Sequence, residues 1–430
     1  MAVASRRSEA LAMPHDGSLI YDTPDSPCAR VVIAGGGVAA LETALALRDL
    51  AGERVSITLV APRPVFTSRA MAVARVFHRG RPRRAELAEI VDKLVCDSVT
   101  GVDPDDRRIR CASGAVLDYD HLVLAIGAKA RPAWSRGITF GEDPAEEALH
   151  CLLEEIERGY VTDVAFVVPS GPVWPLPLYE LAIMTARQAW SMGMDRVRFT
   201  LVTPEERPLG VFGRAPSEAV GALLDSCGIE FVGSTYASVG RRSVVLDPAD
   251  RQLSGVRVVG LPALDGPGLP GVPADPSGFM LTDPHGRVPG LAGVYAAGDG
   301  ATFPIKQGGL ATQQADAAAE SIAAAVGAPV TPEPFRPVLR AMLHTGGDTR
   351  HLLHSIAGGN GEGAIATHEL WSSPAKLAGR YITPYLAGHQ AGRLEPEKPA
   401  TSPSWSRRAP HLTRSRCCLL YTSPSPRDRS

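Results

Sequence analysis

The stretch RVVIAGGGVAALETALALRDLAGERVSITLVAP, residues 30–62, decides the fold. It begins with a short apolar run, passes through three consecutive glycines, and continues into a segment whose apolar residues recur at helical spacing. A second run, rich in β-branched residues, closes it. This order predicts a strand, a helix and a parallel strand, the βαβ unit on which dinucleotide-binding domains are built.

The glycine turn has the spacing of a pyrophosphate-binding loop. Gly35 would permit the tight turn, Gly37 would let the backbone approach a phosphate, and Ala40 is small enough for the helix to pack closely on the strand. The start of the helix would add free amides and the positive end of its dipole. A tight βα turn without a ligand is the structural alternative. The candidate cofactor-binding residues here are Gly35, Gly36, Gly37, Ala39 and Ala40.

The residue expected to bind a ribose departs from the usual pattern. Dinucleotide-binding units commonly carry an acidic residue at the end of the second strand, where it binds a ribose hydroxyl. This chain has Ala61 there, followed by Pro62 and Arg63. Recognition of the ribose must therefore use other groups, such as the main chain or water.

A second βαβ pattern predicts a second domain of the same kind. Residues 163–204 read as strand, helix and strand, and residues 338–355 read as a hairpin around Gly346 and Gly347. We predict an α/β protein with two Rossmann-like domains, the second inserted in the first, and a small C-terminal α+β region. The expected divisions are a disordered tail 1–29, a FAD-binding domain 30–135 and 286–334, a nested NAD(P)-binding-like domain 136–285, a C-terminal interface region 335–390 and a disordered tail 391–430.

Composition excludes several classes of function. The chain has 430 residues and a net charge of −2, so no basic field favours nucleic acid. No apolar run reaches the roughly 18 residues of a membrane span, and the polar N-terminus does not resemble a signal peptide. The seven cysteines lack the spacing of a metal site. We therefore expect a cytoplasmic protein without a bound metal.

The last thirteen residues, 418–430, are set apart from the fold. They read CLLYTSPSPRDRS, and one reading frame of their back-translation resembles a transposase-type sequencing adapter. A lipidated Cys417–Cys418 pair is the alternative, but no prenylation box follows it.

Four segments together resemble a known family: VVIAGGGVAALE, YDHLVLAIGA, GVYAAGDGA and KQGGLATQQADAAAESIA. In this order they are similar to the two-dinucleotide-domain flavoproteins of the pyridine nucleotide-disulfide oxidoreductase superfamily. That group includes type II NADH dehydrogenases, sulfide:quinone reductases and the flavin subunits of flavocytochrome c sulfide dehydrogenases. The resemblance covers most of residues 30–385 and implies FAD as the cofactor.

The resemblance also implies roles for particular residues. In such proteins the aspartate of the Gly-Asp strand end bonds a ribityl hydroxyl of FAD, which carries over to Asp299, with Gly298 allowing close approach. Alternatively, Asp299 could cap the turn that follows it. The strand end holding Ala125 and Gly127 would pass beside the cofactor, and the main chain near Val99 would meet the adenine.

A helix that starts at Gly308 or Gly309 would direct its amides at the flavin. Its positive end would stabilise the negative charge of the reduced ring, so Gly308, Gly309 and Leu310 join the cofactor-binding candidates. Lys306 is the candidate catalytic residue, placed at the flavin edge, and a solvated surface lysine is the alternative.

The nested unit argues against a nicotinamide donor. Its loop, PSGPVWPLPLYE at residues 169–180, places prolines where amides would bind a pyrophosphate. Glu205 and Glu206 follow the second strand, where a ribose partner would be expected, and solvated charges on a helix or turn are the alternative. NAD(P)H as donor therefore stays an alternative. Sulfide chemistry is also doubtful, because the cysteine pairs of the sulfide-oxidising relatives are absent and Cys151 is expected to be an inert thiol within a helix.

The resulting functional prediction is a FAD-dependent oxidoreductase that passes electrons from a small reductant to a quinone-type acceptor. The alternatives are a type II-like NAD(P)H dehydrogenase and a flavin-binding sensor or assembly protein with little turnover. Leu377, Tyr381 and Tyr385 form a stripe that is typical of a core or dimer contact. The aromatic rings also suit a membrane interface. This region is therefore expected to contact either a second copy of the chain in a homodimer or the inner face of the cell membrane.

Overall fold

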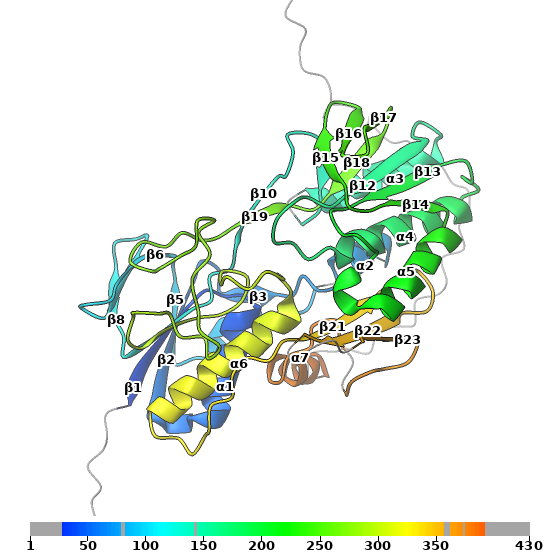
Figure 1. Cartoon of the computed structure of the whole chain (residues 1–430). Coiled ribbons are helices and arrows are strands. Elements are labelled where there is room, and N and C mark those ends of the chain that lie inside the picture. Colours follow the sequence, from blue (N-terminus) through cyan, green and yellow to red (C-terminus); the bar gives the residue numbers. More distant parts are fainter. Residues whose placement is uncertain (1–27, 79–81, 142–143, 357–361, 373–374, 392–430) are drawn as a thin grey trace, which may run out of the picture.

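The computed structural model describes residues 28–78, 82–141, 144–356, 362–372 and 375–391. Most of both predicted tails, including residues 418–430, lies outside these ranges. The described chain forms two lobes, each built on a five-stranded parallel sheet, and a C-terminal region that contacts both (Figure 1).

The first lobe contains the predicted glycine-rich unit. Its sheet has the order β20-β9-β1-β2-β5, and all neighbouring strands are parallel. The strands are β1 (Ala29–Ala34), β2 (Val55–Ala61), β5 (Lys93–Cys96), β9 (His121–Leu124) and β20 (Val294–Ala296). Strand β20 comes from after the second lobe, so the first lobe is formed by two separate segments of the chain.

Both faces of this sheet are buried, which explains the continuous apolar run of β1. Val31 and Ile33 pack in the cluster that contains α1 (Val38–Leu50) and α6 (Gly308–Ala325). Val32 and Ala34 pack in a second cluster with an antiparallel sheet on the other side. The strands of that sheet are β6 (Val99–Asp103), β7 (Arg108–Cys111) and β8 (Val116–Asp118).

The second lobe repeats this plan. Its parallel sheet has the order β11-β18-β12-β13-β14, with three helices on one side and an antiparallel sheet on the other. The parallel strands are β11 (Ile138–Thr139), β18 (Arg257–Gly260), β12 (Asp163–Val167), β13 (Arg198–Val202) and β14 (Ile229–Val232). The helices are α3 (Ala145–Glu157), α4 (Leu176–Ser191) and α5 (Arg214–Ser226), and the antiparallel strands are β15 (Tyr236–Val239), β16 (Ser243–Asp247) and β17 (Arg251–Ser254).

Two antiparallel strands carry the chain between the lobes. β10 (Lys129–Arg131) leaves the first lobe and pairs with β19 (Ala263–Asp265), which returns to it. The second Rossmann-like domain is thus inserted in the first, which confirms the predicted fold class. The domain boundaries given above stay predictions. Shorter elements of the first segment are β3 (Val65–Thr67), α2 (Ala72–His78), β4 (Arg84–Glu86) and single 3-10 turns at Gly52–Arg54 and Leu87–Glu89, with a third at Gly210–Phe212 in the nested lobe.

The C-terminal region joins the two lobes. The predicted hairpin is present as β21 (Val338–Leu343) and β22 (Arg350–Ser355), with β23 (Ala364–Ala366) beside it. β21 packs in the core cluster of the nested lobe, while α7 (Ile382–Ala391) packs against the first lobe. The buried Glu42 carboxylate accepts the amides of Tyr381 and Ile382, at 2.9 and 2.6 Å, and so holds the start of α7.

The apolar stripe near the C-terminus is accounted for by packing. Leu377 and Tyr381 precede α7 instead of lying within one long helix, and both contact the core cluster of the first lobe, as does Tyr385. Within the described ranges, no helix has the length and apolar character needed to cross a bilayer.

Candidate functional site

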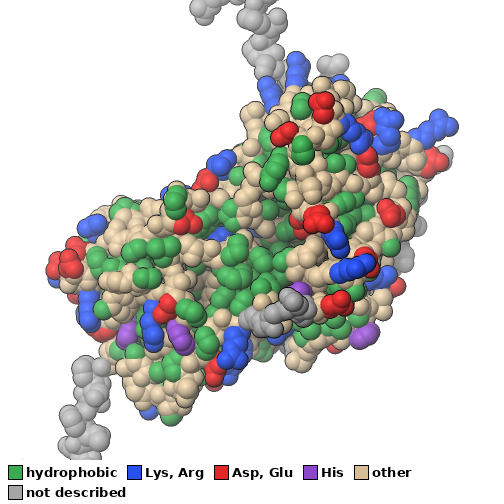
Figure 2. All heavy atoms as spheres, viewed as in Figure 1, with side chains coloured by type: hydrophobic (Ala, Val, Ile, Leu, Met, Phe, Trp, Pro, Cys, Tyr) green, Lys and Arg blue, Asp and Glu red, His purple; other side chains and the backbone are tan. Residues whose placement is uncertain are grey.

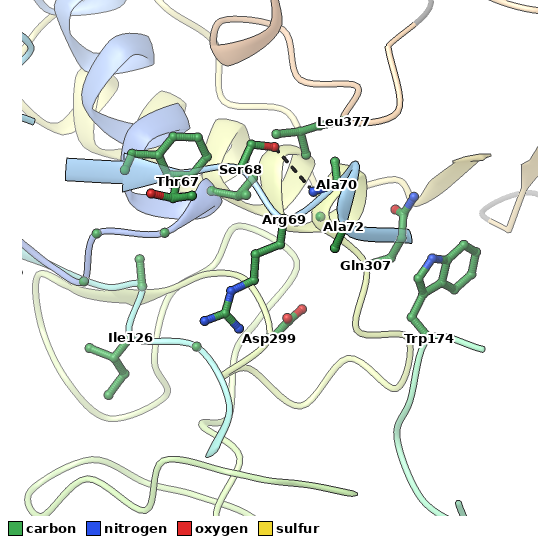
Figure 3. A pocket seen from close by; sticks show the side chains of 18 of the residues that line it. Thr67, Ser68, Arg69, Ala70, Ala72, Ile126, Trp174, Asp299, Gln307 and Leu377 are labelled. Carbon is green, nitrogen blue, oxygen red and sulfur yellow. Dashed lines mark hydrogen bonds between the residues drawn. The ribbon is translucent and has the colours of Figure 1, made fainter. Parts of the chain in front are cut away.

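A cavity of about 640 Å³ lies at the carboxyl ends of the first lobe's strands and extends towards the nested lobe and the C-terminal region. This is the edge at which open α/β sheets bind ligands. Figure 3 shows Ile126 and Asp299 on one side of this space and Trp174, Gln307 and Leu377 on others. Figure 2, in the view of Figure 1, shows hydrophobic side chains gathered at the middle of the molecule, between the lobes.

The glycine turn is shaped by two different constraints. Gly35 has φ +115°, and a Cβ placed on it would lie 2.2 Å from the carbonyl oxygen of Ala125. Only glycine fits this position. Gly37, in contrast, has nothing within 4 Å of an added Cβ, and it is the N-cap of α1 without any side-chain cap. The loop therefore presents open space and helix-start amides to the cavity, which is what a phosphate requires.

Asp299 is the acidic group expected to bind the cofactor. It lines the cavity just beyond β20, and within the described chain its carboxylate accepts no hydrogen bond. Burial raises the pKa of Asp299, and the positive charge of Lys306 opposes this shift. A desolvated carboxylate without a partner is costly, so it favours a ligand that donates hydrogen bonds.

Two arginines add positive charge on the β2 side of the cavity. Arg63 and Arg69 both line it, and neither forms an ion pair with the described acidic residues. Figure 3 shows the Arg69 guanidinium extending into the same space as Asp299. With the Gly37 loop, these groups suit the pyrophosphate of a dinucleotide.

The other predicted residues fall into two groups. Those that line the cavity are Gly35, Gly36, Gly37, Val99, Ala125, Gly127, Asp299 and Gly308. Those that do not are Ala39, Ala40, Gly298, Lys306, Gly309 and Leu310. Gly298 and Ala39 instead serve packing, because a Cβ on Gly298 would lie 3.1 Å from the Cβ of Ala39. Their small size brings α1 close to the end of β20.

The start of α6 differs from the expectation in one respect. The helix begins at Gly308, as predicted, but Gln307 caps it, and the Gln307 side-chain oxygen accepts the Leu310 amide at 3.0 Å. Leu310 itself is buried in the core of the nested lobe. The Gln307 side chain accepts the hydrogen bond of the Leu310 amide, so this amide is not free to bind a molecule in the cavity.

Lys306 is buried, so the solvated-surface interpretation is wrong. Only 6% of it is exposed, its Nζ donates to the carbonyl of Ala301, and it lies 3.9 Å from the centre of the Phe279 ring. Burial lowers the pKa of Lys306 to about 8, against the opposing charges of Asp299 and Asp275. Its ammonium does not line the cavity, and the catalytic role assigned to it stays a prediction.

Lys306→Met should change how stability depends on pH. Because the pKa of Lys306 is about 8 in the folded chain and 10.5 ordinarily, the unfolded chain binds more protons between these values. The free energy of unfolding of the wild type therefore increases by about 2–3 kcal/mol as pH rises between these two pKa values. Lys306→Met should lack that gain in urea unfolding at pH 7.5 and 10, whereas the exposed Lys129→Met should keep it. An equal gain in both variants would contradict the burial argument.

An ion pair that was not predicted from the sequence lines the same cavity. Glu180 is fully buried on α4, and Lys376 Nζ lies 2.5 Å from each of its carboxylate oxygens. The same carboxylate accepts the His344 amide at 2.8 Å. Burial raises the pKa of Glu180 and lowers that of Lys376, while each partner opposes the shift of the other. Both residues line the cavity, and Lys376 exposes 11% of its side chain whereas Glu180 exposes none.

Apolar residues make up much of the remaining lining. They come from both lobes and from the C-terminal hairpin, and they include Phe66, Val73, Phe140, Trp174, Leu176, Met342 and Leu377. No described cysteine lines the cavity. Cys151 lies in α3, as expected, but it is partly exposed and disulfide-bonded, so the expectation of a buried, inert thiol is wrong. By chemistry, the lining consists of polar groups around the glycine loop and Asp299, here called the polar half, and of apolar side chains together with the buried ion pair, here called the apolar half.

Comparison with known proteins identifies the family. The sequence profile of the pyridine nucleotide-disulphide oxidoreductase family matches residues 29–321, most of the chain. The chain belongs to this family. The resemblance drawn from the four segments is thereby confirmed.

Individual relatives are similar over part of their length. The sulfide-quinone reductase of Aquifex aeolicus is 29% identical over 202 residues, 43% of this chain and 44% of that protein. Rhodocoxin reductase of Rhodococcus erythropolis is 27% identical over 296 residues, 64% of this chain and 65% of that protein. The matched part therefore spans less than two thirds of these relatives.

Solved structures share the fold. The sulfide:quinone oxidoreductase of Aquifex aeolicus has a TM-score of 0.71 at 19% identity and covers 85% of this chain and 90% of its own. The ferredoxin reductase for the CYP199A2 system of Rhodopseudomonas palustris has a TM-score of 0.57 at 19% identity, over 77% of this chain and 84% of its own.

Proposed function

We propose that this protein is a FAD-dependent oxidoreductase that passes electrons from a small reductant to a quinone-type acceptor. The observation that carries the proposal is the single cavity with two chemically different halves. The polar half, with Gly37 and Asp299, suits the pyrophosphate and ribityl chain of FAD. The apolar half beside Leu377 suits a flat, poorly soluble acceptor.

The residues of the chain have separable tasks in this proposal. When bound, FAD supplies the two-electron redox chemistry. Asp299 would accept a hydrogen bond from a ribityl hydroxyl of FAD and so help to hold the cofactor in place. The walls that include Phe66 and Leu377 exclude water from the acceptor. Glu180 and Lys376 hold a proton at the cavity wall, and reduction of a quinone to a quinol consumes two protons.

The choice of acceptor follows from the relatives together with the cavity. The sulfide-quinone reductase supports a quinone, and rhodocoxin reductase supports a protein acceptor as the second candidate. The apolar side chains of the lining favour the quinone. A lipid-soluble quinone would bring the protein to a membrane surface, so we propose a cytoplasmic protein in peripheral contact with the inner face of the membrane.

The choice of electron donor is limited by groups that are missing from the described residues of the site. The absence of a cysteine in the cavity lining disfavours sulfide, because that chemistry needs a thiol beside the flavin. NAD(P)H is disfavoured by the nested loop, in which Pro175 is the N-cap of α4 and Pro177 follows in the first turn.

The acceptor is tested with FAD-loaded protein reduced by one equivalent of dithionite without oxygen. Mixing with decylubiquinone in a stopped-flow instrument should restore the oxidised flavin spectrum at a rate that saturates with quinone. A rate that does not exceed reoxidation by ferricyanide and does not saturate would contradict the quinone proposal. It would support the protein acceptor or the sensor with little turnover.

The donor is tested with the same oxidised protein. NADH and NADPH should reduce the flavin slowly, with a rate that rises linearly with concentration, because the nested lobe offers few amides for their pyrophosphate. Rapid reduction that saturates with NADH would instead establish the type II-like NADH dehydrogenase activity.

A further inference from the structure

A second cavity, of about 250 Å³, lies at the carboxyl ends of β12 and β13 in the nested lobe. This is the crevice at which a Rossmann-like domain holds its dinucleotide. Its lining residues come from the loops after both strands, from β15, from the turn at Val211 and from Ile305 of the first lobe. Trp174 lines this cavity and the main one, so the two sites share a wall.

The lining of this second cavity does not suit a dinucleotide or another anion. Pro169 and Pro175 have no amide to donate, and α4 begins with prolines and without a side-chain cap. No lysine, arginine or histidine is among the described residues that line it. The volume is also below the roughly 300–1,000 Å³ of sites for drug-sized ligands.

Glu205, the residue expected to bind a ribose, is engaged internally. Its Oε2 accepts the hydroxyl of Tyr179 at 2.8 Å and that of Thr203 at 3.2 Å. Burial raises the pKa of Glu205 to about 7 despite these bonds. Glu205 is among the residues that line the cavity, and near neutral pH it carries only part of a negative charge. It is therefore an acceptor for a neutral donor more than a partner for a cation.

The aromatic side chains that line the second cavity provide flat ring surfaces and hydrogen-bond donors without a partner in the described chain. Trp174 is held edge-on by Phe212, with ring centroids 5.9 Å apart and an angle of 64°. Its Nε1–H makes no hydrogen bond within the described chain, nor does the hydroxyl of Tyr236, which is 55% exposed at the mouth. Valines, prolines and Ile305 complete the walls.

We propose that this cavity binds an uncharged molecule with one hydroxyl-bearing aromatic ring, of the phenol or hydroquinone class. The ring packs between Trp174, Tyr236 and the aliphatic walls, and the hydroxyl donates to the Glu205 carboxyl. The site replaces the nicotinamide site of a dinucleotide-binding lobe. The proposal concerns binding alone, so it stands or falls independently of the acceptor of the flavin.

Isothermal titration of the FAD-loaded full-length protein with three one-ring probes tests the charge class of the ligand. Phenol, which does not reduce flavin under these conditions, should bind with one-to-one stoichiometry. Benzoate, an anion, and benzylamine, a cation at pH 7.5, should each bind at least about tenfold more weakly. Tighter binding of either charged probe, or no heat with phenol up to its solubility, would overturn the proposal.

Variants then place the probe in this cavity. Tyr236→Ala should weaken phenol binding about tenfold without loss of FAD, because Tyr236 is exposed and outside the main cavity. Tyr160→Ala, which changes a more exposed tyrosine that lines neither cavity, should leave phenol binding unchanged. Equal affinities in the wild type and Tyr236→Ala would show that phenol binds elsewhere and would refute the assignment.

Discussion

Asp299→Ala should lose most of its FAD during purification. The wild-type carboxylate lines the polar half of the main cavity, is desolvated and has no other hydrogen-bond acceptor role in the described chain. A buried bond to a charged acceptor contributes about 1.5–3 kcal/mol, so removing it should weaken FAD binding roughly ten- to a hundredfold. The measurement is the affinity of the apoprotein for FAD, followed by quenching of flavin fluorescence.

Two further variants separate this effect from general damage. Asp106→Ala removes an exposed aspartate of the same lobe, at the turn between β6 and β7, and should bind FAD like the wild type. Asp299→Asn keeps an acceptor oxygen and should fall between the wild type and Asp299→Ala. Wild-type affinity in Asp299→Ala would refute the assignment of the cavity's polar half to the ribityl chain.

Sequence reasoning succeeded where a local pattern determines the structure. The glycine turn, the two βαβ units and the hairpin at Gly346 each depend on residues close together in the chain. The backbone requirement at Gly35 acts in the same way, since its positive φ excludes other residues wherever the loop is placed. The insertion of one domain in the other followed from the order of these patterns.

The same reasoning failed where one side chain changed a local outcome. The start of α6 was placed correctly, yet the residue before it caps the helix and takes the Leu310 amide. The flavin-edge role of Lys306 stays a prediction, but its alternative, a solvated surface lysine, failed because the side chain is buried and donates to Ala301. Neither outcome can be obtained from spacing, because each depends on which way one side chain turns.

The ion pair between Glu180 and Lys376 could not be predicted from the sequence for a different reason. Glu180 and Lys376 are 196 positions apart and come from a helix of the nested lobe and the C-terminal region. A signal was nevertheless present, because Glu180 stands within an otherwise apolar stretch and Lys376 is one of only five lysines in the chain. Charged side chains are rarely buried without a partner, so a partner of opposite charge could be expected for Glu180 and for Lys376.

Breaking this pair should destabilise the protein more than any surface change. Glu180→Gln keeps an acceptor for the His344 amide but leaves the Lys376 ammonium unpaired in a buried site. Loss of one partner of a buried ion pair costs about 3–5 kcal/mol. The double variant Glu180→Gln/Lys376→Met has no buried charge left, and its free energy of unfolding in urea should return close to that of the wild type. A double variant as unstable as the sum of the two single ones would contradict this account.

The Lys376→Met variant alone should depend on pH in a defined direction. Without its cation, the Glu180 carboxyl can avoid an unpaired charge only by binding a proton, so its pKa should rise further above the ordinary value of 4.5. The folded state then binds more protons than the unfolded one, and stability falls as pH rises above that value. The cost of Lys376→Met relative to the wild type should therefore be larger at pH 8.5 than at pH 6.

The double variant also separates packing from chemistry. If the pair only fills space, a double variant with restored stability should let decylubiquinone reoxidise the reduced flavin at the wild-type rate. If the pair holds the proton that a reduced quinone takes up, that rate should fall at least tenfold although the protein is stable, since positioned acids contribute about 10²–10⁴-fold. Ferricyanide takes electrons without protons, so its rate should not change. A slowed quinone reaction with an unaltered ferricyanide reaction would assign the proton to this pair.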